Sequence, residues 1–150
     1  MGCLTGRVQI DRQPDLERII SWLQLLIAPD QIAELRAIYK NGRVCTGYYH
    51  YDHLADMATA AMDLGETRGI KGVYVTLNAL KPELLERADL RNQVRSVNRG
   101  DCASQADVIR RRWLLIDADP KRPPHGQGSA ATDSEKATST LYRNSLADAG

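Results

Sequence analysis

Asn41-Gly42 lies between two apolar-rich runs, residues 32–39 and 43–49, and this dipeptide restricts the fold more than any other local feature. Asn-Gly is the strongest short-range hairpin signal, because a type I′ turn needs a positive φ at both central positions. We therefore expect the two runs to pair as antiparallel strands. Residues 35–38 also fit a helical segment, so a short helix before the turn stays open as an alternative.

Three longer segments are predicted to be helices. The first, residues 14–27, begins with Pro14, which suits a first turn, and repeats its aliphatic residues at helical spacing. The second, residues 52–64, is rich in Ala and Met and ends before Gly65. The third, residues 132–148, starts with the spacing of a capping box, Thr-Asp-Ser-Glu, and should turn Leu141, Tyr142 and Leu146 inward. A shorter helix is expected over residues 82–90.

Two further segments are predicted to be strands. Residues 72–78 alternate and are β-branched, whereas residues 112–119 contain a continuous apolar run typical of a sheet covered on both faces. Helices alternate with strands, which indicates the α/β or α+β class, with a mixed sheet and flanking helices. We expect one domain over residues 1–150, with loops at 91–106 and 120–131. We also expect the strands that end at Asn78 and Asp119 to be neighbours.

Composition excludes several classes of protein. Twenty Lys and Arg against nineteen Asp and Glu leave a net charge of +1, which indicates no particular partner. No apolar run approaches the roughly 18 residues of a membrane span, and the first residues lack the apolar stretch of a signal peptide. The three cysteines are widely spaced, which argues against a disulfide framework or a cysteine zinc site. We expect a cytoplasmic protein with no membrane partner.

The strongest candidate for chemistry is the pair Asp117 and Asp119 at the end of the buried strand. Residues i and i+2 of a strand point to the same face, so both carboxylates project together. Adjacent anions repel unless a cation lies between them, and hard ions such as Mg²⁺ take such oxygen ligands. The pair therefore predicts a divalent metal site, although two solvated acids at a strand end remain the alternative.

The charge around this pair favours an anionic ligand. Residues 87–122 contain nine basic residues against five acids, a local net of +4. A basic surround on a paired-acid centre suits a nucleoside triphosphate or a nucleic acid that is bound partly through metal. A solvated basic face is the alternative.

The run at residues 106–123, which contains Arg-Arg-Trp-Leu-Leu-Ile-Asp-Ala-Asp-Pro-Lys-Arg-Pro, closely resembles the first catalytic motif of phage- and plasmid-type DNA primases. These enzymes belong to the archaeo-eukaryotic primase (primase-polymerase) superfamily. The likeness extends upstream through residues 72–78 and the Leu-Arg-Ala segment at 35–37, and downstream to residues 131–135. It implies part of a primase-polymerase catalytic core.

The resemblance implies metal-dependent, template-directed nucleotidyl transfer from nucleoside triphosphates in DNA replication. Asp117 and Asp119 would be the catalytic residues and the ligands of Mg²⁺ or Mn²⁺. The residues expected to contact nucleotide phosphates are Arg110, Arg112, Arg122 and Asn78, with a simple strand-end role as the alternative for Asn78. The implied partners are nucleoside triphosphates and a DNA template, with a helicase module or a C-terminal half beside them.

The sequence also departs from the family pattern. Such primases continue to a second motif with a catalytic His and a third with another metal-binding acid, and residues up to 150 contain neither; His50, His53 and His125 do not match. We therefore expect the isolated chain to be incomplete, and the alternative is a truncated, inactive remnant that binds nucleotide or DNA. A nucleotide-sugar transferase is disfavoured by the Pro-Lys-Arg-Pro continuation, and a phosphatase of the Asp-x-Asp-x-Thr type by Lys121.

Overall fold

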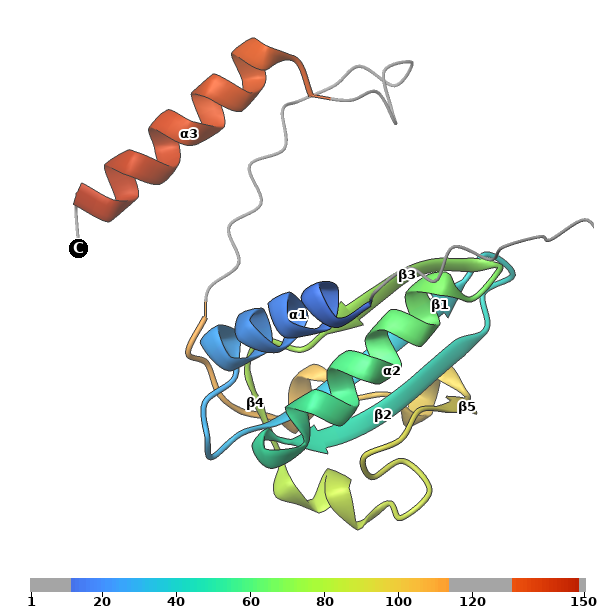
Figure 1. Cartoon of the computed structure of the whole chain (residues 1–150). Helices are drawn as coiled ribbons and strands as arrows, with labels where there is room; N and C mark the ends of the chain where they lie inside the picture. The colour runs from blue at the N-terminus through green and yellow to red at the C-terminus, as the bar shows by residue number, and fades with distance from the viewer. Residues whose placement is uncertain (1–11, 114–130, 149–150) are drawn as a thin grey trace, which may run out of the picture. The chain divides into compact units, whose positions relative to one another are not determined.

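The structure is a computed structural model that describes residues 12–113 and 131–148 (Figure 1). The chain divides into two compact units, residues 1–113 and residues 114–150. In the first unit helices and paired strands occur together, and in the second the described residues form one helix. The α+β class predicted from the sequence is therefore confirmed.

The elements of the described residues follow one another in this order: α1 (Gln13–Leu26), β1 (Ile32–Tyr39), β2 (Val44–His50), a 3₁₀ helix (Tyr51–His53), α2 (Leu54–Glu66), β3 (Ile70–Val75), β4 (Ala79–Leu80), a 3₁₀ helix (Pro82–Glu86), β5 (Arg95–Val97), two 3₁₀ turns (Arg99–Asp101 and Gln105–Asp107), β6 (Val108–Arg110) and α3 (Asp133–Asp148). The helix expected over 82–90 is thus a 3₁₀ helix of five residues. The loop expected over 91–106 contains β5 and both 3₁₀ turns.

The hairpin predicted at Asn41-Gly42 is confirmed, since β1 pairs with β2 from Ile32 opposite His50 to Ile38 opposite Val44. The alternative of a helix at residues 35–38 is wrong. The turn differs from the expected type I′ geometry, because φ is positive at Gly42 (+84°) but not at Asn41. The Gly42 amide donates to the Tyr39 carbonyl at 2.9 Å, and residues 40–42 form a three-residue loop with a left-handed glycine at its end.

The main sheet has the strand order β3-β1-β2-β5, and every pair of named strands in the described residues is antiparallel. A single parallel bridge, between Tyr48 and Arg91, joins β2 to the segment that precedes β5. The strand predicted at 72–78 corresponds to β3, which begins at Ile70 and ends at Val75. β4 and β6 form a separate two-stranded sheet.

Helices α1 and α2 cover one face of the main sheet (Figure 1). The side chains of β1 alternate, so Ala33 and Leu35 point into this layer, where they are 1% and 2% exposed. α2 supplies Met57 and Ala58, both fully buried, because its small residues allow close packing on the strands. This packing explains why α1 repeats its aliphatic residues at helical spacing and why α2 is rich in Ala and Met.

The opposite face of the sheet has a second, smaller core. Its buried members come from β1, β2, β4 and the irregular chain after β4: Ile32, Tyr48, Leu80, Leu84 and Leu90. Within residues 12–113 no long helix packs on this face; short strands and 3₁₀ turns of residues 79–110 pack on it instead. Glu34 and Arg36 lie on this side, because they alternate along β1 with Ala33 and Leu35.

α3 confirms the last predicted helix and its capping box. The Glu135 amide donates to the Thr132 hydroxyl at 3.3 Å, and the Glu135 carboxylate accepts from the Thr132 amide at 2.7 Å. Leu141, which was expected to turn inward, is 70% exposed on α3 itself, and the side chains of Tyr142 and Leu146 lie outside the described part of the chain. None of the described helices has the length and apolarity that a membrane crossing requires.

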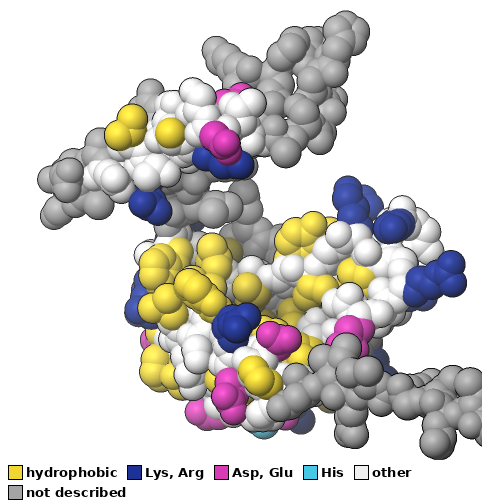
Figure 2. Space-filling view, turned by 45° about the horizontal axis from the view of Figure 1, so that its top comes forward, with side chains coloured by type: hydrophobic (Ala, Val, Ile, Leu, Met, Phe, Trp, Pro, Cys, Tyr) yellow, Lys and Arg dark blue, Asp and Glu magenta, His cyan; other side chains and the backbone are white. Residues whose placement is uncertain are grey.

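α1 leaves large apolar side chains at the surface of the first unit. Trp22 is 60% exposed and Leu25 is 56% exposed, although Leu23 between them is buried. Figure 2 shows hydrophobic side chains gathered on one part of the face that it draws, with lysine and arginine side chains projecting from its right-hand edge.

Candidate functional site

Asn78, which follows β3, joins this strand to the chain that leads toward the paired acids. Its side-chain oxygen Oδ1 accepts hydrogen bonds from the backbone amides of Arg112 (2.8 Å) and Trp113 (2.9 Å). Its Nδ2 donates to the Trp113 carbonyl at 3.2 Å. The carboxamide thus bonds as a strand neighbour would, and it continues the pairing of Ala79 with Arg110. These three bonds occupy Asn78, so the role that the geometry supports is to position Arg112 and Trp113 rather than to hold a phosphate.

Trp113 forms a second anchor for the same segment. Its indole Nε1 donates to the Leu26 carbonyl at 2.7 Å. The last carbonyls of a helix have no partner within the helix, and Trp113 satisfies one at the end of α1. The chain is therefore held from two sides immediately before residue 114.

The basic residues before this point have separate contacts. The Arg110 guanidinium forms an exposed ion pair with Asp30 at 3.0 Å. Arg112 lies over the Trp113 ring, 5.6 Å from its centre. Arg111 is exposed and forms no ion pair within the described residues. Arg110 and Arg112 are thus accessible to an anion, but they are engaged with different neighbours.

The paired acids and Arg122 fall outside the described residues, as does most of the strand predicted at 112–119. Where it is described, this segment begins beside Asn78, but the pairing expected for residues 114–119 lies outside the described part. Within residues 12–113 and 131–148, no group of three or more His, Cys, Asp or Glu is arranged to hold a metal ion. His50 and His53 each contact a neighbouring acid, Asp52 and Asp56.

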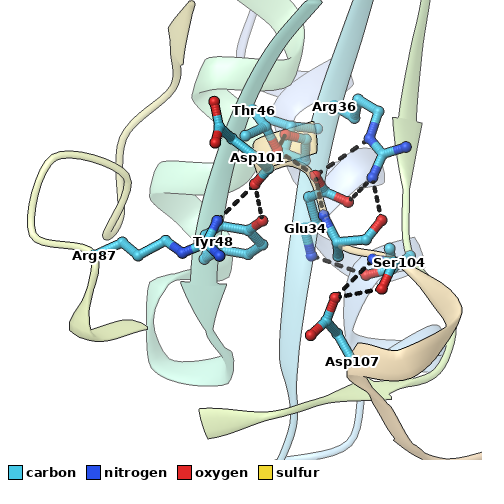
Figure 3. Close-up of polar contacts among 11 residues, drawn as sticks. Glu34, Arg36, Thr46, Tyr48, Arg87, Asp101, Ser104 and Asp107 are labelled. Atoms are coloured by element: carbon cyan, nitrogen blue, oxygen red, sulfur yellow. Dashed lines mark hydrogen bonds and ion pairs between the residues drawn. The ribbon is translucent and has the colours of Figure 1, made fainter. Parts of the chain in front are cut away.

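A buried acid on β1 is a site that sequence reasoning missed. Glu34 is fully buried, and it accepts hydrogen bonds from Arg36, the Thr46 hydroxyl and the Ala103 amide (Figure 3). Arg36 is two residues along the same strand, so both side chains leave the same face of the sheet. The sequence signal for this pair was an acid and a base two residues apart within an otherwise apolar strand.

The Arg36 guanidinium is fixed by these contacts. Nη2 donates to the Glu34 carboxylate at 2.5 Å and to the Ala103 carbonyl at 2.8 Å, while Nε donates to Glu34 at 3.2 Å. Burial alone would lower the pKa of Arg36, but the hydrogen bonds and charge of Glu34 outweigh it and raise that pKa above its ordinary value. Arg36 therefore keeps its charge beside the buried Glu34 side chain.

The segment after β5 is tied to the sheet beside this pair. The Asp101 carbonyl accepts hydrogen bonds from the Tyr48 hydroxyl at 3.0 Å and from Arg87 at 2.6 Å (Figure 3). The Ser104 amide and hydroxyl both donate to the Asp107 carboxylate at 2.8 Å. These bonds, the amide's more than the hydroxyl's, hold the pKa of Asp107 below its ordinary value. Burial raises the pKa of the nearby Cys102 thiol, which makes it a poor nucleophile.

This network borders a pocket of about 420 Å³. β1 contributes Arg36 and Ile38, β3 contributes Tyr74, and residues 103–105 form another part of its wall. The pocket lies on the sheet face opposite α1 and α2, since Arg36 alternates with the core residue Leu35. Its walls are mainly apolar with a few polar groups, which is typical of a small-molecule site.

Comparisons with protein families, curated proteins and solved structures find no match to this chain.

Proposed function

We propose that the chain is a primase-polymerase-like protein, which carries out metal-dependent, template-directed nucleotidyl transfer from nucleoside triphosphates in DNA replication. The observation that carries the proposal is the run at residues 106–123, with its two acids one residue apart. The anchoring of Arg112 and Trp113 supports it, because a reactive pair needs a fixed approach from the scaffold.

Asp117 and Asp119 are the proposed metal ligands. Two carboxylates that leave one face of a strand are the hard oxygen donors that Mg²⁺ and Mn²⁺ prefer. A bound ion would neutralise the triphosphate and polarise the phosphoryl group that the primer hydroxyl attacks. The contribution of the chain would be to present both carboxylates to one ion, since residues i and i+2 of the expected strand share a face.

Arg110, Arg112 and Arg122 are the proposed phosphate contacts. The pair between Arg110 and Asp30 is exposed on both sides, and such pairs contribute only about 0–1 kcal/mol. A phosphate could therefore replace Asp30 at little cost. Arg112 stacks on Trp113 without an acidic partner in the described residues, which leaves its charge available.

A second candidate is the binding of nucleotide or DNA without catalysis. It is favoured by four arginines that follow the 3₁₀ helix at 82–86 and form no ion pair within the described part of the chain: Arg87, Arg91, Arg95 and Arg99. Unpaired arginines near one segment attract a polyanion through its phosphates, whatever the chain does chemically.

The test is a titration with Mn²⁺ and a nucleoside triphosphate, together with a primer-extension assay, on wild type and on Asp117→Asn/Asp119→Asn. We expect metal-dependent nucleotide binding that the double variant loses. The control is Asp52→Asn/Asp56→Asn, which neutralises two exposed acids of the first unit and should bind as wild type. Extension that the double variant abolishes supports the first candidate, and binding without extension supports the second. Binding unchanged in the double variant would sink the site assignment.

A further inference from the structure

The pocket beside Arg36 has features that the proposed metal site does not use. It lies on the face of the sheet that no long helix of residues 12–113 covers, and its apolar surface includes residues of β1, β3 and β6. Its polar groups are few: the Glu34–Arg36 pair, Thr76 and residues 104–105. Pockets of this size and lining bind small organic molecules through shape and a small number of directed hydrogen bonds.

Tyr74 gives this pocket an aromatic surface. The residue is 51% exposed and lies on β3, the edge strand of the sheet that pairs with β1. Its ring lies back along the strand over Gly72, where a Cβ would be 2.6 Å from the Tyr74 hydroxyl oxygen and 2.8 Å from Cζ. The missing side chain at Gly72 therefore lets the ring lie against the strand, where it forms part of the pocket lining.

Arg36 gives the pocket a fixed, planar hydrogen-bond donor. Its Nε and Nη2 are bound to Glu34 and the Ala103 carbonyl, and Nη1 has no partner within residues 12–113 and 131–148 (Figure 3). The Gln105 carboxamide, also at the pocket, has no hydrogen bond in the described part of the chain. It can both donate and accept.

The charge of the pocket selects against an anion. Arg36 is already paired with the buried Glu34 at 2.5 Å, so a phosphate placed here would not meet a free cation. A neutral, planar ring with acceptor and donor atoms on its edge meets all three features: the Tyr74 ring, the Nη1 donor and the Gln105 amide. Sheet-borne aromatic side chains bind nucleobases by stacking, and arginine and amide groups bind their edges.

We propose that this pocket binds a nucleobase, stacked on Tyr74 and hydrogen-bonded at its edge to Arg36. The base could come from a free nucleotide or from single-stranded nucleic acid, since both present the same ring. The inference goes beyond the proposed function, because it depends on residues of β1, β3 and the 103–105 segment and not on Asp117, Asp119 or a metal.

The test is an NMR titration of the ¹⁵N-labelled full chain without divalent metal, using uridine, adenosine and ribose 5-phosphate as probes. We expect the nucleosides to shift the amides of residues 74–76 and 103–105, and ribose 5-phosphate to leave them in place. Added salt should change the affinity little, because no phosphate anchors the base. Uridine triphosphate and a short oligothymidine then distinguish a free nucleotide from single-stranded nucleic acid as the source of the base. The source is the one whose probe binds more tightly than the nucleoside and loses affinity in Tyr74→Leu.

Three variants test the stacking. Tyr74→Leu should weaken nucleoside binding about tenfold, the scale of one lost stacking contact, while Tyr74→Phe keeps the ring and should bind as wild type. Gly72→Ala should also weaken binding, because the added methyl group displaces the ring. Trp22→Leu is the matched control, an exposed aromatic residue on α1 across the sheet.

The proposal is overturned if Tyr74→Leu binds nucleosides as wild type does, if the pocket amides do not respond, or if ribose 5-phosphate binds as well as uridine. Its failure is distinguishable from that of the proposed function. Nucleoside binding should persist in Asp117→Asn/Asp119→Asn, and a loss of metal-dependent nucleotide binding in that variant leaves the base pocket intact.

Discussion

The side chain of Asn78 binds the backbone of Trp113 on both sides, accepting from its amide at 2.9 Å and donating to its carbonyl at 3.2 Å, across 35 positions of sequence. A third bond, from the Arg112 amide, makes one carboxamide the link between β3 and the segment before the paired acids. The position of Asn78 therefore sets the positions of Arg112 and Trp113.

We expect Asn78→Ala to lower the free energy of unfolding by about 1–3 kcal/mol, because it leaves two backbone amides and a carbonyl without partners. Urea unfolding measures this change. Asn78→Asp keeps the acceptor and loses the donor, so it should fall between wild type and Asn78→Ala. Asn41→Ala is the control, since Asn41 makes one exposed bond in the hairpin turn, to the Arg43 amide. Equal effects at the two asparagines would contradict the anchoring role.

Two glycines should respond in opposite directions to alanine. A Cβ at Gly47 would clash with the Gln93 carbonyl group, because residues 90–92 bond along β2 at Tyr48. Gly47→Ala should therefore cost about 2–3 kcal/mol. Gly65 lies in α2 with nothing within 4 Å of its Cβ position, and Gly65→Ala should stabilise by up to about 1 kcal/mol. Thermal unfolding of both variants tests the close approach at β2.

The elements that the sequence predicted well are those with a local cause. α1, α2 and α3 follow from apolar spacing, a first-turn proline and a capping box, and the hairpin follows from Asn41-Gly42. Each signal acts within a few residues, so no knowledge of the partner was needed. The turn geometry was less predictable, because a loop of two or three residues depends on how the strands pair.

The candidate site depended more on tertiary contacts. The polar residue at 78 was recognisable as a strand-end group, but its bonds to Trp113 arise only when segments 35 residues apart meet. The burial of Glu34 could not be derived either, since it requires the Ala103 amide and Thr46 to cover the carboxylate. β5 has only three residues, which are too few to show an alternating sequence pattern. It is a strand because it pairs with β2.

Alkaline pH should destabilise the first unit through its buried tyrosines. Burial first, and then the charge of Asp56, raise the pKa of Tyr49 from 10.0 to about 12. Between these values the unfolded chain loses the tyrosine proton while the native chain keeps it, so stability falls as pH rises through this window. The loss is roughly 2–3 kcal/mol for a shift of this size.

Tyr49→Phe isolates this effect, because it keeps the ring in the core beside α2 and removes only the ionisable group. We expect nearly unchanged stability below pH 10 and a smaller loss toward pH 12 than in wild type. Urea unfolding at several pH values measures it, with phenolate absorbance as the independent record of titration. Identical pH profiles for the two proteins would contradict the shift.

α3 should be the least protected helix of the described residues. Leu141 is 70% exposed, and the capping box of Thr132 and Glu135 holds the first turn of the helix. Thr132→Ala removes the hydroxyl cap and should cost about 1 kcal/mol of local stability. Amide exchange in α3 should then become faster, while exchange in α2 stays unchanged. Ser134→Ala is the control within the same first turn. Faster exchange in α2 than in α3 of wild type would contradict this ranking.

The ion pair of Glu34 and Arg36 should be costly to break and cheaper to remove. Glu34→Met leaves the Arg36 guanidinium without its carboxylate on a partly buried face. Breaking a buried pair costs about 3 kcal/mol of unfolding free energy, and the cost here should be smaller because Arg36 is 31% exposed and reaches water. In Glu34→Met/Arg36→Met no charge remains to be desolvated, so this double variant should be about 1 kcal/mol more stable than the single one.

Asp63→Asn, which breaks the exposed pair with Arg12, is the control and should change stability by less than about 0.5 kcal/mol. Urea unfolding of the four proteins gives the comparison. A double variant that is less stable than Glu34→Met would show that Arg36 contributes mainly through packing and its bond to the Ala103 carbonyl, and not through the charge of Glu34.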